Sequence, residues 1–190
     1  MKKIIVPLAL TLAVAFTATA EPKKTTALKV GDAAPEFKIK DTNGKEINLA
    51  KLAKKGPVLV CLTCGCLGCD RELPYFQALH EAYKKEGIRL VAVFAEPDEK
   101  FAKYVKTRKL NMQYALDPKR NSWKIFGTKT MPSNFLIEKG GKVAAISKGC
   151  DPSGLIARNL GDKAATLVKT AKVDIKAQVD KNRKPVTPKK

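Results

Sequence analysis

The fold is decided by residues 58–74, VLVCLTCGCLGCDRELP. Val58 to Leu62 is a continuous apolar run with the length and β-branching of a strand that is buried on both faces. Cysteines follow at once, and the spacing of the apolar residues beyond them predicts a helix from about Leu67 to Lys85, with Pro74 inside it. The stretch therefore predicts a buried strand, a Cys66-Leu67-Gly68-Cys69 motif and a helix, in that order.

This order favours reversible thiol chemistry. The first Cys of such a motif lies at a helix N-terminus, where unpaired backbone N–H groups and the helix dipole stabilise a thiolate. Such positions lower the pKa of a thiol from about 8.5 to roughly 3.5–7.5. We therefore expect Cys66 to be a nucleophile near neutral pH, and Cys69, one helical turn further on, to resolve the mixed disulfide that Cys66 forms.

Zinc sites share this spacing, but the rest of the chain does not complete one. A structural zinc site needs four ligands, and here the second pair is missing: His80 is the only histidine and Cys150 stands alone. We therefore interpret the motif as a redox pair, with no metal and no cofactor.

The segments around the motif predict an α/β fold. Further strands are expected at 88–95, 112–115, 134–137 and 142–146, helices at 99–107, 121–126 and 153–172, and a hairpin over 37–40 and 46–49. With a right-handed crossover between the first two core strands, this order gives a central mixed β-sheet flanked by helices, with an N-terminal β-hairpin.

Three blocks of the chain resemble the redoxin (AhpC/TSA) branch of the thioredoxin-like superfamily, over the segment from Val30 to about Gly149. They are Gly31–Phe37, Cys66–Pro74 and Gly127–Ile137, of which the second is similar to the pattern C-x-x-C-x-x-E-x-P. The segment is most similar to TlpA/ResA-type exported thiol–disulfide oxidoreductases. The resemblance implies a thioredoxin-like fold and electron exchange with protein thiols and disulfides, together with an electron donor that the sequence does not identify.

The resemblance also implies roles for three residues outside the cysteine pair. Met131-Pro132 occupies the place of a cis-proline loop, which presents the backbone of Met131 as an edge for an extended substrate. A trans proline at a strand start is the alternative interpretation. Glu72 matches a buried glutamate that tunes the thiols in some members, and an ordinary exposed helix glutamate is the alternative.

Two departures from the family pattern leave the direction of electron flow open. Gly65 stands where the family usually has Trp, and Leu67-Gly68 replaces the usual Gly-Pro or Glu-Pro. Either a reductant or an oxidant is compatible with these residues.

The remaining cysteines are not explained by the family pattern. Cys64 is a candidate accessory thiol, which either acts as a second resolving group or is a passive small residue. Cys61 lies in the middle of the predicted strand and is expected to be inert core. Cys150 has no expected role.

A peroxiredoxin-like thiol peroxidase is the chief alternative function. Thr63 lies three residues before Cys66, as a peroxidatic Thr-x-x-Cys requires. Leu59, however, stands where the peroxidase motif has Pro, and no arginine is clearly placed to polarise a peroxide.

A Cu(I)-binding chaperone is a third alternative. Cys61, Cys64, Cys66 and Cys69 form a C-x-x-C-x-C-x-x-C series of soft ligands that suit Cu(I). We disfavour this function because no histidine accompanies the series and Cys61, on a strand, is expected to point away from the other sulfurs.

The N-terminal residues have the layout of a secretory signal. Lys2 and Lys3 precede an almost wholly apolar run from Ile4 to Phe16, and Ala18-Thr19-Ala20 supplies the small residues of a cleavage site. The run is shorter than the ~20 residues of a membrane span, and an uncleaved anchor is the alternative. We therefore expect a cleaved signal peptide at 1–20, export to the periplasm or another extracytoplasmic compartment, a flexible lead-in at 21–29, the redoxin domain at 30–172 and a basic disordered tail at 173–190.

The charge of the chain is strongly positive. The formal net charge is +19, and loss of Lys2 and Lys3 with the leader leaves +17. Nucleic acid is excluded as a partner by export and by the absence of an aromatic stacking motif. Most of the lysines are expected to form a solvated face, which allows weak attraction to anionic envelope surfaces.

Cleavage after Ala20 gives the first testable prediction. The mature protein should begin near Glu21 and fractionate as a soluble protein, because the apolar run is short and ends in small residues. Mass spectrometry of the protein from its native host is the measurement. Membrane-bound protein that retains Lys2 would contradict the prediction.

Overall fold

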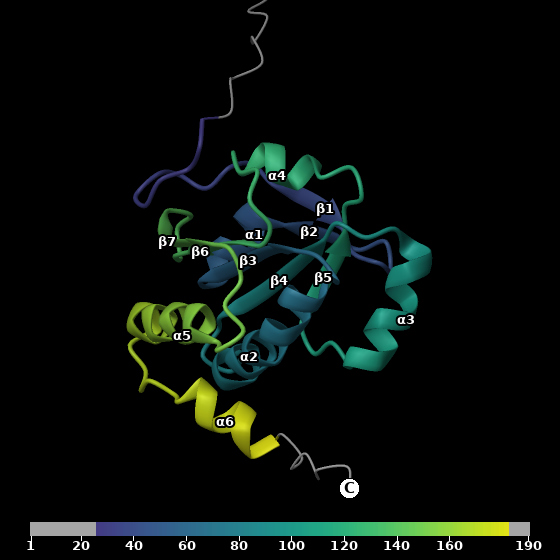
Figure 1. Cartoon of the computed structure of the whole chain (residues 1–190). Coiled ribbons are helices and arrows are strands. Elements are labelled where there is room, and N and C mark those ends of the chain that lie inside the picture. Colours follow the sequence, from purple (N-terminus) through teal and green to yellow (C-terminus); the bar gives the residue numbers. More distant parts are fainter. Residues whose placement is uncertain (1–25, 183–190) are drawn as a thin grey trace, which may run out of the picture.

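The computed structural model describes residues 26–182, and its sheet is built around β3 (Val58–Thr63) (Figure 1). The five strands of this sheet are ordered β5-β4-β3-β6-β7. The others are β4 (Arg89–Phe94), β5 (Gln113–Leu116), β6 (Ser133–Ile137) and β7 (Val143–Lys148). β3, β4 and β5 are parallel, whereas β6 runs antiparallel to both of its neighbours, β3 and β7, which confirms the predicted mixed sheet.

β3 is buried on both faces because each face of the sheet is covered by helices. Leu59 and Cys61 contribute to the core beneath α2 (Leu67–Tyr83), and this core also contains residues of α3 (Asp98–Arg108), α5 (Leu155–Val168) and α6 (Ile175–Asn182). Val58, Val60 and Leu62 point to the opposite face, beneath α1 (Leu49–Lys55) and α4 (Asn121–Ile125). The alternation follows from the two-residue period of a strand.

The predicted hairpin is present as β1 (Lys38–Lys40) and β2 (Glu46–Asn48), paired antiparallel. The predicted second strand, 46–49, is one residue too long, because Leu49 begins α1, a helix that the sequence pattern did not predict. The Asn48 side chain accepts a hydrogen bond from the backbone N–H of Lys51 at 3.0 Å and so caps the helix. Asparagine is a favoured N-cap, so a signal for this helix is present in the sequence.

The predicted limits of the folded domain are wrong at both ends. The segment from Val173 onward was expected to be disordered, but α6 packs Ile175 and Val179 into the core, where their exposed fractions are 1% and 4%. The predicted flexible lead-in ends too late, because Leu28 packs against the core beneath α1 and α4. In both cases sparse apolar residues in a lysine-rich segment are buried by long-range contacts.

The predicted leader at 1–20, residues 21–25 of the lead-in and residues 183–190 of the tail lie outside the described residues. Between residues 26 and 182, no helix has the combination of length and apolar character that crossing a membrane requires.

Candidate active site

The junction between β3 and α2 places Cys66 at the start of the helix. Cys66 is the N-cap residue, with extended backbone angles of φ −72° and ψ 160°, and its carbonyl accepts a hydrogen bond from the N–H of Asp70 at 2.9 Å. The first N–H groups of a helix have no partner within it, so they are available to an anion at the cap position. The Cys66 side chain is exposed, whereas Cys69 is only 6% exposed.

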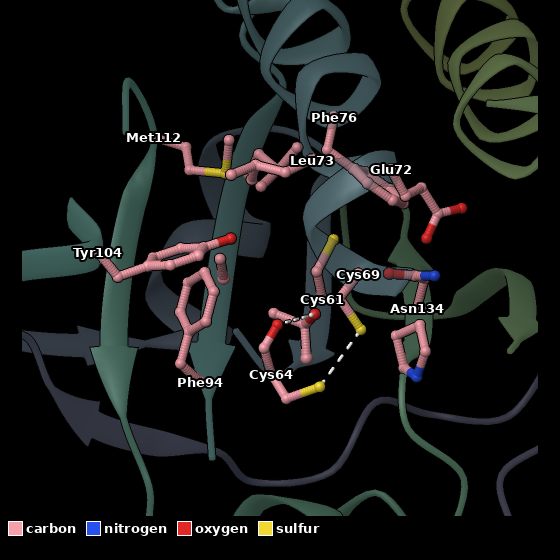
Figure 2. Close-up of a pocket in the computed structure, with 14 residues that line it drawn as sticks. Cys61, Cys64, Cys69, Glu72, Leu73, Phe76, Phe94, Tyr104, Met112 and Asn134 are labelled. Atoms are coloured by element: carbon pink, nitrogen blue, oxygen red, sulfur yellow. Dashed lines mark hydrogen bonds between the residues drawn. The ribbon is translucent and has the colours of Figure 1, made fainter. Parts of the chain in front are cut away.

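Three sulfur atoms lie together at this junction. The Sγ of Cys69 is 3.5 Å from the Sγ of Cys66 and 3.4 Å from the Sγ of Cys64. All three Sγ atoms lie within 4.8 Å of one another. Figure 2 shows the sulfurs of Cys64 and Cys69 facing each other, with Cys61 set further back in the pocket. The structure therefore brings the accessory thiol as close to Cys69 as the first cysteine of the motif.

The three thiols differ in acidity. The Cys64 thiol and the backbone N–H groups of Cys69 and Gly68 favour the thiolate of Cys66 and lower its pKa. Burial raises the pKa of Cys64 and that of Cys69 above the ordinary value of a thiol. Cys66 is therefore the most acidic and the most accessible of the three, as a nucleophile requires.

Glu72 lies on the next turn of α2 and is only 2% exposed, so the alternative of an exposed surface glutamate is wrong. Its Oε1 accepts a hydrogen bond from the backbone N–H of Asp151 at 3.3 Å. Burial raises the pKa of the Glu72 carboxyl from its ordinary value of 4.5 to about 7. At neutral pH this carboxyl therefore populates both the protonated and the ionised form.

A small cavity joins Glu72 to the cysteines. It has a volume of about 20 Å³, and its lining includes Cys61, Cys64, Cys69, Glu72 and Pro132 (Figure 2). A cavity of this size holds one water molecule when polar groups line it. Burial, and next the charge of Glu72, raise the pKa of Cys61 well above the ordinary value, so Cys61 is held as a neutral thiol.

The Met131-Pro132 peptide bond is cis, as the resemblance implied. The pairing of Leu62 in β3 with Ser133 in β6 brings Pro132 beside the end of β3 and hence beside the cysteines. Within residues 26–182, the backbone N–H and C=O of Met131 have no hydrogen-bond partner. These two groups are therefore free to pair with an extended chain.

Tyr104 and Glu96 are site residues that sequence analysis did not identify. The backbone N–H of Gly65 donates a hydrogen bond to Oε1 of Glu96 at 2.9 Å. A Cβ placed on Gly65 would lie 3.6 Å from the ring of Tyr104. Tyr104, from α3, thus supplies an aromatic ring next to the position where the family usually carries Trp. The sequence pattern predicts the helix that carries Tyr104 but indicates no role for this residue at the site.

Cys150, for which no role was expected, lies beside the motif. A Cβ placed on Gly68 would come within 3.0 Å of the Sγ of Cys150, which is exposed. The loop that follows β7 carries both Cys150 and the Asp151 N–H that binds Glu72. No local sequence pattern links this loop to α2, since the contact depends on the fold.

Comparison with known proteins identifies what the site resembles. Residues 30–146 match the model of the AhpC/TSA family. The thiol-disulfide oxidoreductase ResA of Bacillus thuringiensis subsp. konkukian is 34% identical over 153 residues, which cover 77% of this chain and 86% of that protein. A crystal structure from Chlorobium tepidum, assigned as a thiol:disulfide interchange protein DsbE, superimposes with a TM-score of 0.68 at 25% identity, covering 75% of this chain and 99% of that one.

A peroxidase structure shares the fold as well. Peroxidoxin BcpB from Mycobacterium tuberculosis superimposes with a TM-score of 0.59 at 20% identity, covering 75% of this chain and 97% of that one. At this identity the similarity concerns the fold alone, so the choice between exchange and peroxide reduction depends on the relatives of higher identity and on the site.

The raised pKa of Glu72 predicts a pH-dependent stability. The folded protein keeps a proton on Glu72 that the unfolded chain releases above its ordinary pKa of 4.5, so wild-type stability falls as the pH rises from 4.5 to about 7. Glu72→Gln removes this loss, and its free energy of unfolding relative to wild type should rise across this interval by up to about 3 kcal/mol. Urea denaturation at pH 4.5 and pH 8 is the measurement.

The matched control for this prediction is Glu86→Gln, a change of the same kind at an exposed position just beyond α2. In this variant the free energy of unfolding should change between pH 4.5 and pH 8 by about the same amount as in wild type. If the Glu72→Gln and wild-type stabilities change in parallel with pH, the Glu72 carboxyl is ionised normally in the folded state and its assignment to a buried site is wrong.

Proposed function

Because this chain belongs to the AhpC/TSA family and is a thiol–disulfide oxidoreductase, we propose that Cys66 is its nucleophile and Cys69 its resolving thiol. The observation that carries the assignment is the 3.5 Å separation of the two sulfurs, one exposed at the cap of α2 and the other buried behind it. The exposed sulfur is accessible to a protein substrate. The buried sulfur lies close enough to the first to attack it once a mixed disulfide has formed.

The reaction proceeds by two thiolate attacks. The Cys66 thiolate attacks a substrate disulfide, forms a mixed disulfide and expels one substrate thiolate. The Cys69 thiol loses its proton and attacks the Cys66 sulfur, which releases the second substrate thiolate. Two electrons pass from the enzyme dithiol to the substrate, and the reverse sequence oxidises a substrate dithiol.

Glu72 is proposed to take the proton from Cys69. Burial raises the pKa of Cys69, so its thiol is neutral at pH 7 and needs a base before it can attack. Glu72 and Cys69 line the same cavity, which is large enough for one bridging water molecule. A carboxyl whose pKa is about 7 both accepts and returns a proton near neutral pH.

The substrate is proposed to bind at the edge formed by Met131. The unpaired backbone groups of Met131 favour an extended peptide that adds to this edge. Leu67, which is 67% exposed directly after the nucleophile, adds an apolar contact beside the same opening. Recognition through backbone groups and one apolar side chain suits a range of protein substrates.

We propose that the protein works after export, with a thiol-bearing electron donor outside the cytosol. The leader pattern at residues 1–20 and the similarity to ResA and DsbE support this location. An oxidising compartment supplies disulfides for the exchange. The formal charge of +17 without Lys2 and Lys3 favours a weak, salt-sensitive attraction to anionic envelope surfaces.

Removal of the resolving thiol gives the test of the proposed chemistry. Cys69→Ser should stall at the mixed disulfide, so envelope proteins accumulate covalently on Cys66 and are released by dithiothreitol. Non-reducing gel electrophoresis after acid quenching measures the adducts. Cys64→Ser/Cys69→Ser should trap at least as much, since it lacks both neighbouring thiols, and Cys66→Ser should trap none.

The alternative peroxidase function is separated by comparing two rates in the wild-type protein. The rate of exchange with a protein disulfide should exceed the rate of oxidation by hydrogen peroxide, because Leu59 stands in place of the Pro of a peroxidase motif. Saturable peroxide turnover with negligible disulfide exchange would favour the peroxidase instead. So would the absence of a trapped adduct in both Cys69→Ser and Cys64→Ser/Cys69→Ser.

A further inference from the structure

One buried sulfur has two neighbouring sulfurs at nearly equal distance. Cys69 lies 3.4 Å from Cys64 and 3.5 Å from Cys66, measured between Sγ atoms. A Cys-x-x-Cys pair needs only one partner for its second cysteine. The additional sulfur comes from the loop between β3 and α2, five residues before Cys69, and is half-buried.

We propose that the disulfide first formed between Cys66 and Cys69 moves to Cys64 and Cys69, which gives the oxidised protein a free Cys66 and a disulfide isomerase activity. The proposal rests on the proposed function, since the first bridge forms by that exchange. It extends that function because an oxidised Cys-x-x-Cys protein otherwise has no thiol with which to attack a second disulfide.

The transfer conserves atoms and electrons. The Cys64 thiol gives up its proton, its sulfur forms a bond to the Cys69 sulfur, and the bond between Cys69 and Cys66 breaks. Cys66 leaves as a thiolate, and the proton passes to solvent. One disulfide is broken and one is formed, so no external oxidant or reductant takes part.

The acidity of the three thiols favours this direction. In thiol–disulfide exchange, the thiol of lower pKa is the better leaving group. In the reduced protein the Cys64 thiol and the backbone N–H groups of Cys69 and Gly68 lower the pKa of Cys66, whereas burial raises the pKa of both Cys64 and Cys69. The Cys64 donor is lost once Cys64 is bridged, but the two N–H groups remain and still favour the Cys66 thiolate. Of the three clustered thiols, a bridge between Cys64 and Cys69 therefore joins the two that ionise less readily and leaves Cys66 as an exposed thiolate.

The free Cys66 can then rearrange a substrate without net electron transfer. Its thiolate attacks a non-native disulfide and releases one substrate thiolate, which attacks another disulfide in the same substrate. A later substrate thiolate attacks the mixed disulfide and restores Cys66. The exposed Leu67 beside this nucleophile provides a contact for the apolar segments that incompletely folded substrates expose.

Mapping of the free thiols after exchange is the direct test. The reduced protein is mixed with excess insulin, quenched with acid, alkylated under denaturing conditions and digested with trypsin. The peptide of residues 56–71 contains four of the five cysteines, so fragmentation of this one peptide locates the label. We expect alkyl groups on Cys61 and Cys66, with Cys64 and Cys69 joined.

The same map separates failure of this proposal from failure of the proposed function. Label on Cys61 and Cys64, with Cys66 and Cys69 joined, would overturn the transfer and leave the exchange reaction intact. Label on all four cysteines of the peptide would show that no exchange with the disulfide substrate takes place.

Variants at Cys64 separate its sulfur from its hydrogen bond. Cys64→Ser keeps a small hydroxyl donor but cannot form a bridge. After oxidation this variant should therefore show no alkyl label on Cys66. The rate at which it refolds scrambled ribonuclease without added reductant should fall at least about tenfold. Cys150→Ser, which removes the exposed thiol beside Gly68, is the control and should keep the wild-type map. Isomerase activity of oxidised Cys64→Ser equal to that of wild type would contradict the proposal.

Discussion

The chemistry of this protein depends on the way in which α2 begins directly after the central strand. β3 is held between β4 and β6, so its end is fixed in space, and α2 starts four residues later with Cys66 at its cap. The unpaired N–H groups of the first helical turn then face one sulfur and stabilise its thiolate. The segment before β6, the helix α3 and the loop after β7 then bring further groups to this junction.

The thiols around the junction differ in burial, and this difference fits them for different steps of the reaction. Cys66 is exposed, Cys64 is half-buried and Cys69 is buried, and the same burial continues into Glu72 one turn further along α2. Cys66, the most exposed of the three, is also the most acidic, since burial disfavours the charged forms of Cys64 and Cys69 and raises their pKa values. Substrate attack and the resolving step can therefore be assigned to different residues.

The sequence is most informative where the structure is locally determined. The apolar run of β3, the following motif and the Pro132 loop can each be recognised from a short segment of sequence taken by itself. Tyr104 and Cys150 could not be found in this way, because each reaches the motif from a segment distant in sequence, Tyr104 from α3 and Cys150 from the loop after β7. α6 was missed for the same reason, since only two of its residues are buried and these lie in a lysine-rich segment.

A difference in acidity sets Cys66 apart from Cys64 and Cys69, because the Cys64 thiol and the N–H groups at the start of α2 lower its pKa while burial raises theirs. It is tested most directly by the rate of alkylation of each cysteine in the fully reduced protein, measured against pH by mass spectrometry. Cys66 should be alkylated first, and the midpoint of its rate against pH should lie below the pKa of an ordinary cysteine thiol. Faster alkylation of Cys64 or Cys69, or a midpoint for Cys66 at or above the ordinary value, would contradict it.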